Sequence, residues 1–157
     1  MDYDAGAAVL AGLIGGAIMV VPLYMGMAAM PNQMRMNLLL MLGTMMIFRS
    51  GMMAYAMGAM VHAVMSIVFA LIHVAVYNGL GLESELVAWG ALFGFVHWII
   101  TGMGLGMMRF MHPLVRGGQM DDPGAFALGF PRMTAIGFFM LHIAFGVSVG
   151  AFYEIFV

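Results

Sequence analysis

The sequence predicts an all-α membrane protein, a polytopic four-helix bundle made of two tandem two-helix repeats with a short interfacial helix after the first span. The chain of 157 residues is 64% hydrophobic and only 8% charged, whereas soluble domains carry about 25% charged residues. Its apolar residues form four continuous runs near the ~20 residues that cross a bilayer. Continuous runs indicate helices rather than the alternating strands of a barrel. Cysteine is absent, which excludes disulfides and thiolate sites.

Four spans are expected, over residues 5–29, 51–77, 86–108 and 133–156. In the first, Gly12 and Gly16 form a small-xxx-small face that lets helices approach closely, and Pro22 is expected to kink the helix. After this span, Asn37 is expected to cap an apolar helix over 38–48. That helix is too short to cross the bilayer and is expected to lie at the interface.

The chain is a single integral membrane domain, 1–157, that contains two similar halves at about 4–82 and 84–157. Span four carries a motif at His142, Gly146, Gly150 and Tyr153. Span two carries its echo at His62, Ser66, Ala70 and His73. Gly90 and Gly94 in span three likewise repeat the Gly-xxx-Gly spacing of span one. Spans one and three point the same way, which predicts a parallel repeat with its pseudo-axis along the membrane normal. The segment 112–131 is expected to be a polar loop.

Charge placement predicts the topology. All five positive residues lie between spans one and two or between spans three and four: Arg35, Arg49, Arg109, Arg116 and Arg132. The termini and the middle turn hold Asp2, Asp4, Glu83, Glu85 and Glu154. The positive-inside rule places the arginine-bearing loops in the cytoplasm and both termini outside, in a cell (inner) membrane. The acidic start predicts no cleavable signal peptide.

Three histidines are candidates for chemistry. At a rise of 1.5 Å per residue, His62, His97 and His142 each lie about 15 Å from the nearer surface, close to the midplane. Ionisable residues at this depth suggest a functional site by default. Three imidazoles suit zinc or copper, and a pair suits axial ligation of haem. Additional soft ligands for Cu(I) are Met19, Met60 and Met140. The sequence favours packing and hydrogen bonding by these histidines over a metal or haem site, and a proton or substrate path is a third alternative. No catalytic residue is assigned.

Two further patterns favour structural roles. His73 and Tyr153 are expected near the outer surface as interfacial anchors, because polar rings favour that zone. The chain also contains 22 methionines. Soft thioethers suit Cu(I), but methionine is also an adaptable filler of loosely specified interfaces. The sequence favours filler and a partner-facing surface.

The His-xxx-Gly-xxx-Gly-xx-Tyr pattern in span four resembles that of small uncharacterised four-helix membrane proteins of bacteria and archaea. The resemblance implies the fold and carries no activity. The sequence favours a non-enzymatic accessory or assembly subunit of a larger membrane complex. In the lipid bilayer it would contact other membrane subunits, or itself, through small-xxx-small faces. The alternatives are a copper-, zinc- or haem-binding redox protein that uses the midplane histidines, and a small oligomeric transporter. No nucleic-acid partner is expected, because there is no basic patch.

Overall fold

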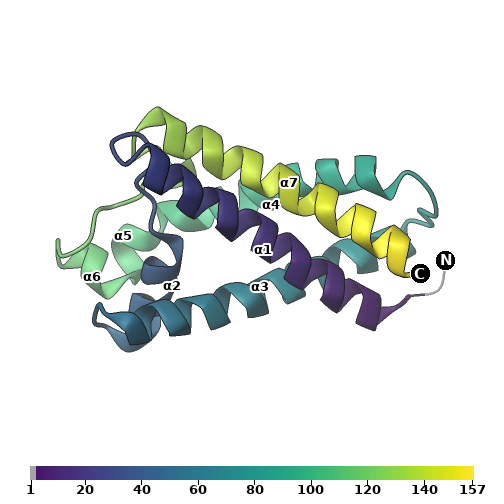
Figure 1. The fold of residues 1–157 in the computed structure, drawn as a ribbon, viewed down its shortest axis with the longest axis horizontal. Helices are drawn as coiled ribbons and strands as arrows, with labels where there is room; N and C mark the ends of the chain where they lie inside the picture. Colours follow the sequence, from purple (N-terminus) through teal and green to yellow (C-terminus); the bar gives the residue numbers. More distant parts are fainter. Residues whose placement is uncertain (1–2) are drawn as a thin grey trace. The chain divides into compact units, whose positions relative to one another are not determined.

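Four long helices dominate the computed structural model, which describes residues 3–157 (Figure 1). They are α1 (Ala5–Ala29), α3 (Met52–Gly79), α4 (Leu86–Gly106) and α7 (Arg132–Phe156). The chain is 77% helical and the described residues contain no strand. All four helices are long and apolar enough to cross a membrane, as the sequence predicts, so this is a multi-pass helical membrane protein. Asp2, which entered the charge argument, lies outside the described residues.

The contacts divide the chain into two compact units. Unit 1 consists of Met1–Pro22, Ala63–Trp98 and Met140–Val157, and unit 2 of Leu23–His62 and Ile99–Phe139. Each unit therefore contains a segment of every long helix. The polypeptide crosses from one unit to the other four times, and each crossing lies inside one of the long helices.

Unit 1 joins the start of α1 to the end of α7, which lie side by side (Figure 1). The side chain of Asp4 accepts a hydrogen bond from the amide of Ala7 at 2.9 Å, which satisfies one of the free amides of the first turn. The amide of Asp4 donates to the Tyr153 hydroxyl at 3.0 Å. The core beside these contacts is built from alanines of α1 and large side chains such as Phe145 and Val74.

Unit 2 contains the helix α2 (Leu38–Ile47), which has 10 residues and is too short to span a bilayer. The side-chain oxygen of Asn37 accepts from the amide of Leu40 at 3.2 Å, which confirms the predicted N-cap. The same oxygen accepts from the Tyr24 hydroxyl at 2.7 Å. The side-chain nitrogen Nδ2 of Asn37 donates to the Tyr55 hydroxyl at 2.6 Å. One neutral side chain thus joins α1, α2 and α3.

The segment expected to be a polar loop contains more structure than predicted. The segment contains the short helix α6 (Pro113–Arg116) and the 3-10 turn η1 (Ala125–Ala127). The short helix α5 (Met108–Met111) comes just before it. His112 caps α6, since its Nδ1 accepts from the amide of Val115 at 3.3 Å. Its Nε2 therefore carries the proton and donates to the carbonyl of Met41 in α2 at 3.0 Å. The fully buried His112 ring ties the two short-helix regions together.

The loop after α1 is fastened to the start of α7. The hydroxyl of Thr134 donates to the Gln33 carbonyl at 2.9 Å and accepts from the Arg35 amide at 3.2 Å. Two exposed ion pairs, Arg35–Asp121 and Arg109–Asp122, each at 3.3 Å, hold the loop between α6 and α7. Exposed pairs contribute at most about 1 kcal/mol, so the buried neutral bonds contribute more to this arrangement.

The Asn37 junction leads to a stability prediction. Asn37→Ala removes a helix cap and the partners of two tyrosine hydroxyls, and we expect a loss of about 1–3 kcal/mol of unfolding free energy. The measurement is reversible unfolding of the detergent-solubilised protein by SDS titration. The matched control is Asn32→Ala in an exposed turn, where we expect a change within about 0.5 kcal/mol. Equal losses in both variants would show that the junction has no special role.

Candidate functional site

Helix backbones in unit 1 approach each other at glycines. A methyl group added to Gly90 of α4 would meet the carbonyl oxygen of Gly146 in α7, and one added to Gly146 would meet the carbonyl oxygen of Gly90. A methyl group on Gly94 would meet the carbonyl of His142. Helices that touch through their backbones are typical of small-xxx-small faces in membranes. This contact brings the side chains of α4 and α7 into close range.

Three imidazole rings lie together in unit 1, and we call His73, His97 and His142 the imidazole cluster. The ring centroids of His97 and His142 are 4.9 Å apart and their planes meet at 82°. The ring of His73, from α3, lies 6.0 Å from that of His97 at 89°. The exposed fractions of the three residues are 4%, 7% and 5%. The cluster is therefore formed by three helices and is closed to the surroundings.

Phenylalanines enclose the cluster. The ring of Phe69 stacks on His97 with centroids 3.7 Å apart. Phe145 lies 5.3 Å from His97 and 5.8 Å from His73, and Phe93 lies 5.9 Å from His73. Aromatic pairs of this kind contribute about 0.5–1.5 kcal/mol each beyond the burial of area. Ring packing thus holds the imidazoles in an apolar environment.

Two buried polar atoms beside this packing have no hydrogen-bond partner among the described residues. They are Nδ1 of His73 and the hydroxyl of Tyr77, one helical turn away. A buried polar atom without a partner costs about 1–3 kcal/mol. Such atoms are uncommon in native proteins and call for an explanation, such as a redox or catalytic role or a bound water or ion. The cluster therefore differs from the polar groups of unit 2, where the buried His112 and the half-buried Asn37 have their partners.

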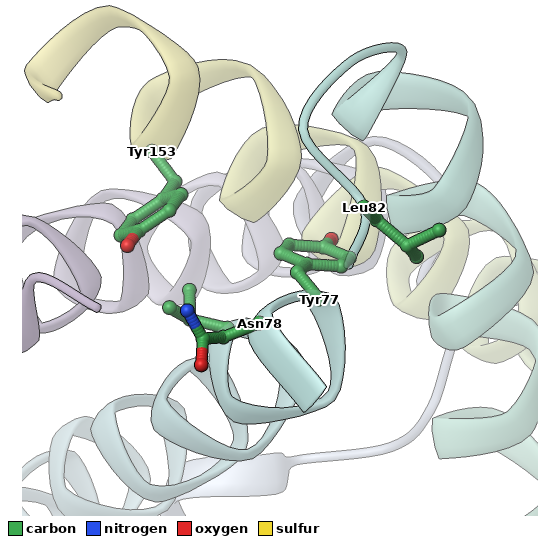
Figure 2. Close-up of a pocket in the computed structure, with 5 residues that line it drawn as sticks. Tyr77, Asn78, Leu82 and Tyr153 are labelled. Carbon is green, nitrogen blue, oxygen red and sulfur yellow. The ribbon is translucent and has the colours of Figure 1, made fainter. Parts of the chain in front are cut away.

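A small pocket lies at the end of α3, one turn from His73 (Figure 2). Its lining is Val74, Tyr77, Asn78, Leu82 and Tyr153. Figure 2 shows Tyr77 and Tyr153 facing it from α3 and α7, with Leu82 supplied by the turn after α3. The pocket brings open space close to the cluster from this end of unit 1.

The structure brings together two of the three predicted midplane histidines, His97 and His142. The third ring beside them is His73. His62 is half-buried and belongs to unit 2. The expectation that His73 and Tyr153 are interfacial anchors is wrong, because both point into unit 1 and are only 4% and 2% exposed.

A signal for His73 is present in the sequence. Ser66, Ala70, His73 and Tyr77 follow one another at intervals of three or four residues, and such positions share a helix face. Small residues on that face mark it as the packed one. This pattern places His73 in the interior together with Ser66 and Ala70, both of which are buried.

The three methionines predicted as thioether ligands differ in how far they are buried. Met19 is 7% exposed and belongs to the core of unit 1, whereas Met60 and Met140 are each 55% exposed. Among residues 3–157, no three His, Asp or Glu side chains are arranged to hold a metal ion as they stand. Metal binding by His62, His97 and His142, or axial ligation of haem, stays a prediction.

The backbone contacts lead to a second stability prediction. We expect Gly146→Ala to destabilise the protein by about 1–3 kcal/mol, because the added methyl group would force α4 and α7 apart. Gly104→Ala is the matched control, since a methyl group there meets nothing within 4 Å. In the control, the better helix propensity of alanine should increase the free energy of unfolding by at most about 1 kcal/mol. SDS titration measures both, and equal or reversed effects would contradict the close approach.

Comparisons with known proteins add no further evidence on these residues. No protein-family model, no curated protein and no solved structure matches the chain. The function is therefore inferred from the contacts and the surface of the molecule itself.

Proposed function

We propose that this protein is a non-catalytic membrane subunit that packs against other membrane proteins through a methionine surface on unit 2. The observation that carries the proposal is a difference in composition between the exposed surfaces of the two units. In the described residues, methionines are nine of the fifteen large apolar side chains that unit 2 exposes, and two of the seventeen that unit 1 exposes.

We define the methionine surface by its members. They are Met25, Met46, Met52, Met53, Met60, Met103, Met107, Met111 and Met133. Among its described methionines, unit 1 exposes only Met65 and Met140, and its other exposed large apolar residues are mainly branched aliphatic ones such as Leu92 and Ile72. Lipid contact is served equally well by leucine or isoleucine. Methionine adds three rotatable bonds and a polarizable sulfur, which suit a surface that must adapt to a protein partner.

Part of this surface lies along one line. Met103 near the end of α4, Met107 between α4 and α5, and Met111 at the end of α5 follow at intervals of four residues and are 62%, 53% and 56% exposed. The spacing places them on one side of consecutive helical turns. Gly104 lies beside them, exposed and with open space over it. A partner helix could approach closely at such a position.

We also infer that the chain is a tandem repeat, and equivalent contacts support this. A methyl group on Gly12 of α1 would meet the carbonyl of Ser66 in α3 at 2.8 Å. The equivalent residues of the second half are Gly90 and Gly146, where the same carbonyl contact occurs. The repeat is consistent with a scaffold, because the α1–α3 pair and the α4–α7 pair pack through the same contact of a glycine against a backbone carbonyl.

We further infer that the arginine-bearing loops face the cytoplasm and that α2 lies at that interface. All five arginines, from Arg35 to Arg132, belong to unit 2, and positive residues concentrate on the cytoplasmic side. Both described ends of the chain belong to unit 1, which contains no positive side chain.

Single cysteines test this topology, because the native chain contains none. We expect Ser84→Cys, in the turn before α4, to react with a membrane-impermeant maleimide in intact cells. We expect Gln119→Cys, in the loop before α7, to react only after permeabilisation. Both positions are exposed, so access to the reagent and not burial decides the result. The opposite pattern would invert the topology.

Site-specific photo-crosslinking tests the partner surface. A benzophenone amino acid placed at Met103 or Met107 should give the same discrete protein adduct in native membranes. The matched controls are Leu92 and Ile100, which are exposed on the same helix outside the set of methionines. These positions should give mainly lipid adducts.

Mass spectrometry of the adduct identifies the partner, and a dimer of this chain would assign the surface to self-association. The proposal fails if all four positions behave alike, or if native membranes yield only the monomer.

A further inference from the structure

A small-residue face of α4 in unit 2 is covered by a later segment of the same chain. A methyl group added to Gly102 would meet the ring of Phe126, and one added to Gly106 would lie 3.0 Å from the Cβ atom of Ala125. The two glycines are four residues apart and share one side of the helix. Their spacing is the small-xxx-small pattern through which membrane helices approach one another. The turn η1 therefore occupies a face that suits a second helix.

The backbone of η1 is strained. Phe126 has φ 55° and ψ 27°, and Ala127 has φ 60°. Residues other than glycine enter this left-handed region at a steric cost, and a bulky residue there is an outlier. Such strain persists only where the surrounding structure enforces it, and it gathers at switch regions. The seating of the Phe126 ring on α4 is a constraint of this kind, and release of the ring would relieve the strain.

The segment around η1 is closed on itself. The amide of Gly124 donates to the Asp122 carboxylate at 2.9 Å, and the amide of Gly129 donates to the Pro123 carbonyl at 2.7 Å. These bonds would keep the segment together if it moved as one piece. The exposed ion pairs of Asp121 and Asp122 join it to arginines elsewhere in unit 2. Exposed pairs hold weakly and are screened by salt, so the segment is suited to detach.

We propose that residues 121–130 form an autoinhibitory strap, which leaves Gly102 and Gly106 when a partner helix packs on that face of α4. The face adjoins the methionine surface, because Met103 and Met107 follow the glycines by one residue, about 100° around the helix. The partner would be a transmembrane helix with small residues of its own, which can approach the glycines closely. The inference rests on the methionine surface proposed above as the docking place.

Opening of the strap is measured by the reactivity of a buried position. Ala127 is fully buried, and the native chain contains no cysteine. We expect the thiol of Ala127→Cys to react with N-ethylmaleimide in detergent faster than the whole chain unfolds. Adding Asp121→Asn and Asp122→Asn should accelerate the reaction roughly 2- to 10-fold, because two exposed ion pairs are lost.

Leu128→Cys is the matched control for reactivity, because Leu128 is 70% exposed in the same segment. Its labelling rate should be the same with and without the two aspartates. The strap is overturned if Ala127→Cys reacts no faster than the chain unfolds, or if loss of the aspartates leaves its rate unchanged.

A disulfide tests what the strap does to the partner. Gly106→Cys with Ala125→Cys can form one, since a Cβ atom at 106 lies 3.0 Å from that of Ala125 and a small shift gives the roughly 3.5–4.5 Å of a disulfide. With a benzophenone amino acid at Met103, the oxidised double variant should lose the partner adduct in native membranes, and reduction should restore it. Ala125→Cys alone, treated with the same oxidant, should keep the adduct.

The outcomes separate the two proposals. Equal adduct yields with the strap locked and free overturn the strap and leave the methionine surface in place. If the cysteine-free chain with the probe gives no adduct, the methionine surface fails and the inhibitory role fails with it. Should Ala127→Cys not fold, the comparison of locked and free strap decides alone.

Discussion

The helices of unit 1 approach as closely as their backbones allow, and glycine sets that distance. In a bilayer, apolar surfaces gain nothing by leaving lipid for one another, so helix association depends on close van der Waals contact. Gly90 and Gly146 give α4 and α7 that contact, and Gly12 does the same for α1 against α3. The positions of His97 and His142 follow from it, because both side chains leave backbones that are already touching. Larger residues at these glycines would move the rings apart as well as the helices.

The spans and the Asn37 cap could be predicted because they depend on local properties. Hydrophobic length identifies a crossing helix, and a cap is recognised from the residue types at a helix start. The composition of the imidazole cluster could not be predicted from depth. Depth groups His97 and His142 with His62. His62 and His73 share one face of α3, so the height of α3 beside α4, and not its rotation, determines that His73 lies against His97 inside unit 1. The face shared with Ser66 and Ala70 indicates that His73 is interior, but His62 lies on the same face, so the pattern alone does not choose between the two histidines.

His112 and Thr134 show a different limit of sequence reasoning. Each is nearly or fully buried and joins segments far apart in the chain. Their partners are backbone groups, which leave no trace in residue identity. Together with Asn37, they show how unit 2 is fastened by neutral side chains whose hydrogen bonds are made. The imidazole cluster departs from that rule, because Nδ1 of His73 has no hydrogen-bond partner among the described residues.

The methionine surface also has a chemical consequence. A thioether is oxidised by peroxide to a sulfoxide, which is polar, chiral and poorly suited to an apolar contact. Methionines exposed on unit 2 would lose their fit to a proposed partner in this way, whereas unit 1 exposes few methionines and its surface would change less. Since methionine sulfoxide reductases reverse the change, the damage is repairable. If the protein assembles through this surface as proposed, oxidative stress would loosen the assembly before it unfolded the bundle.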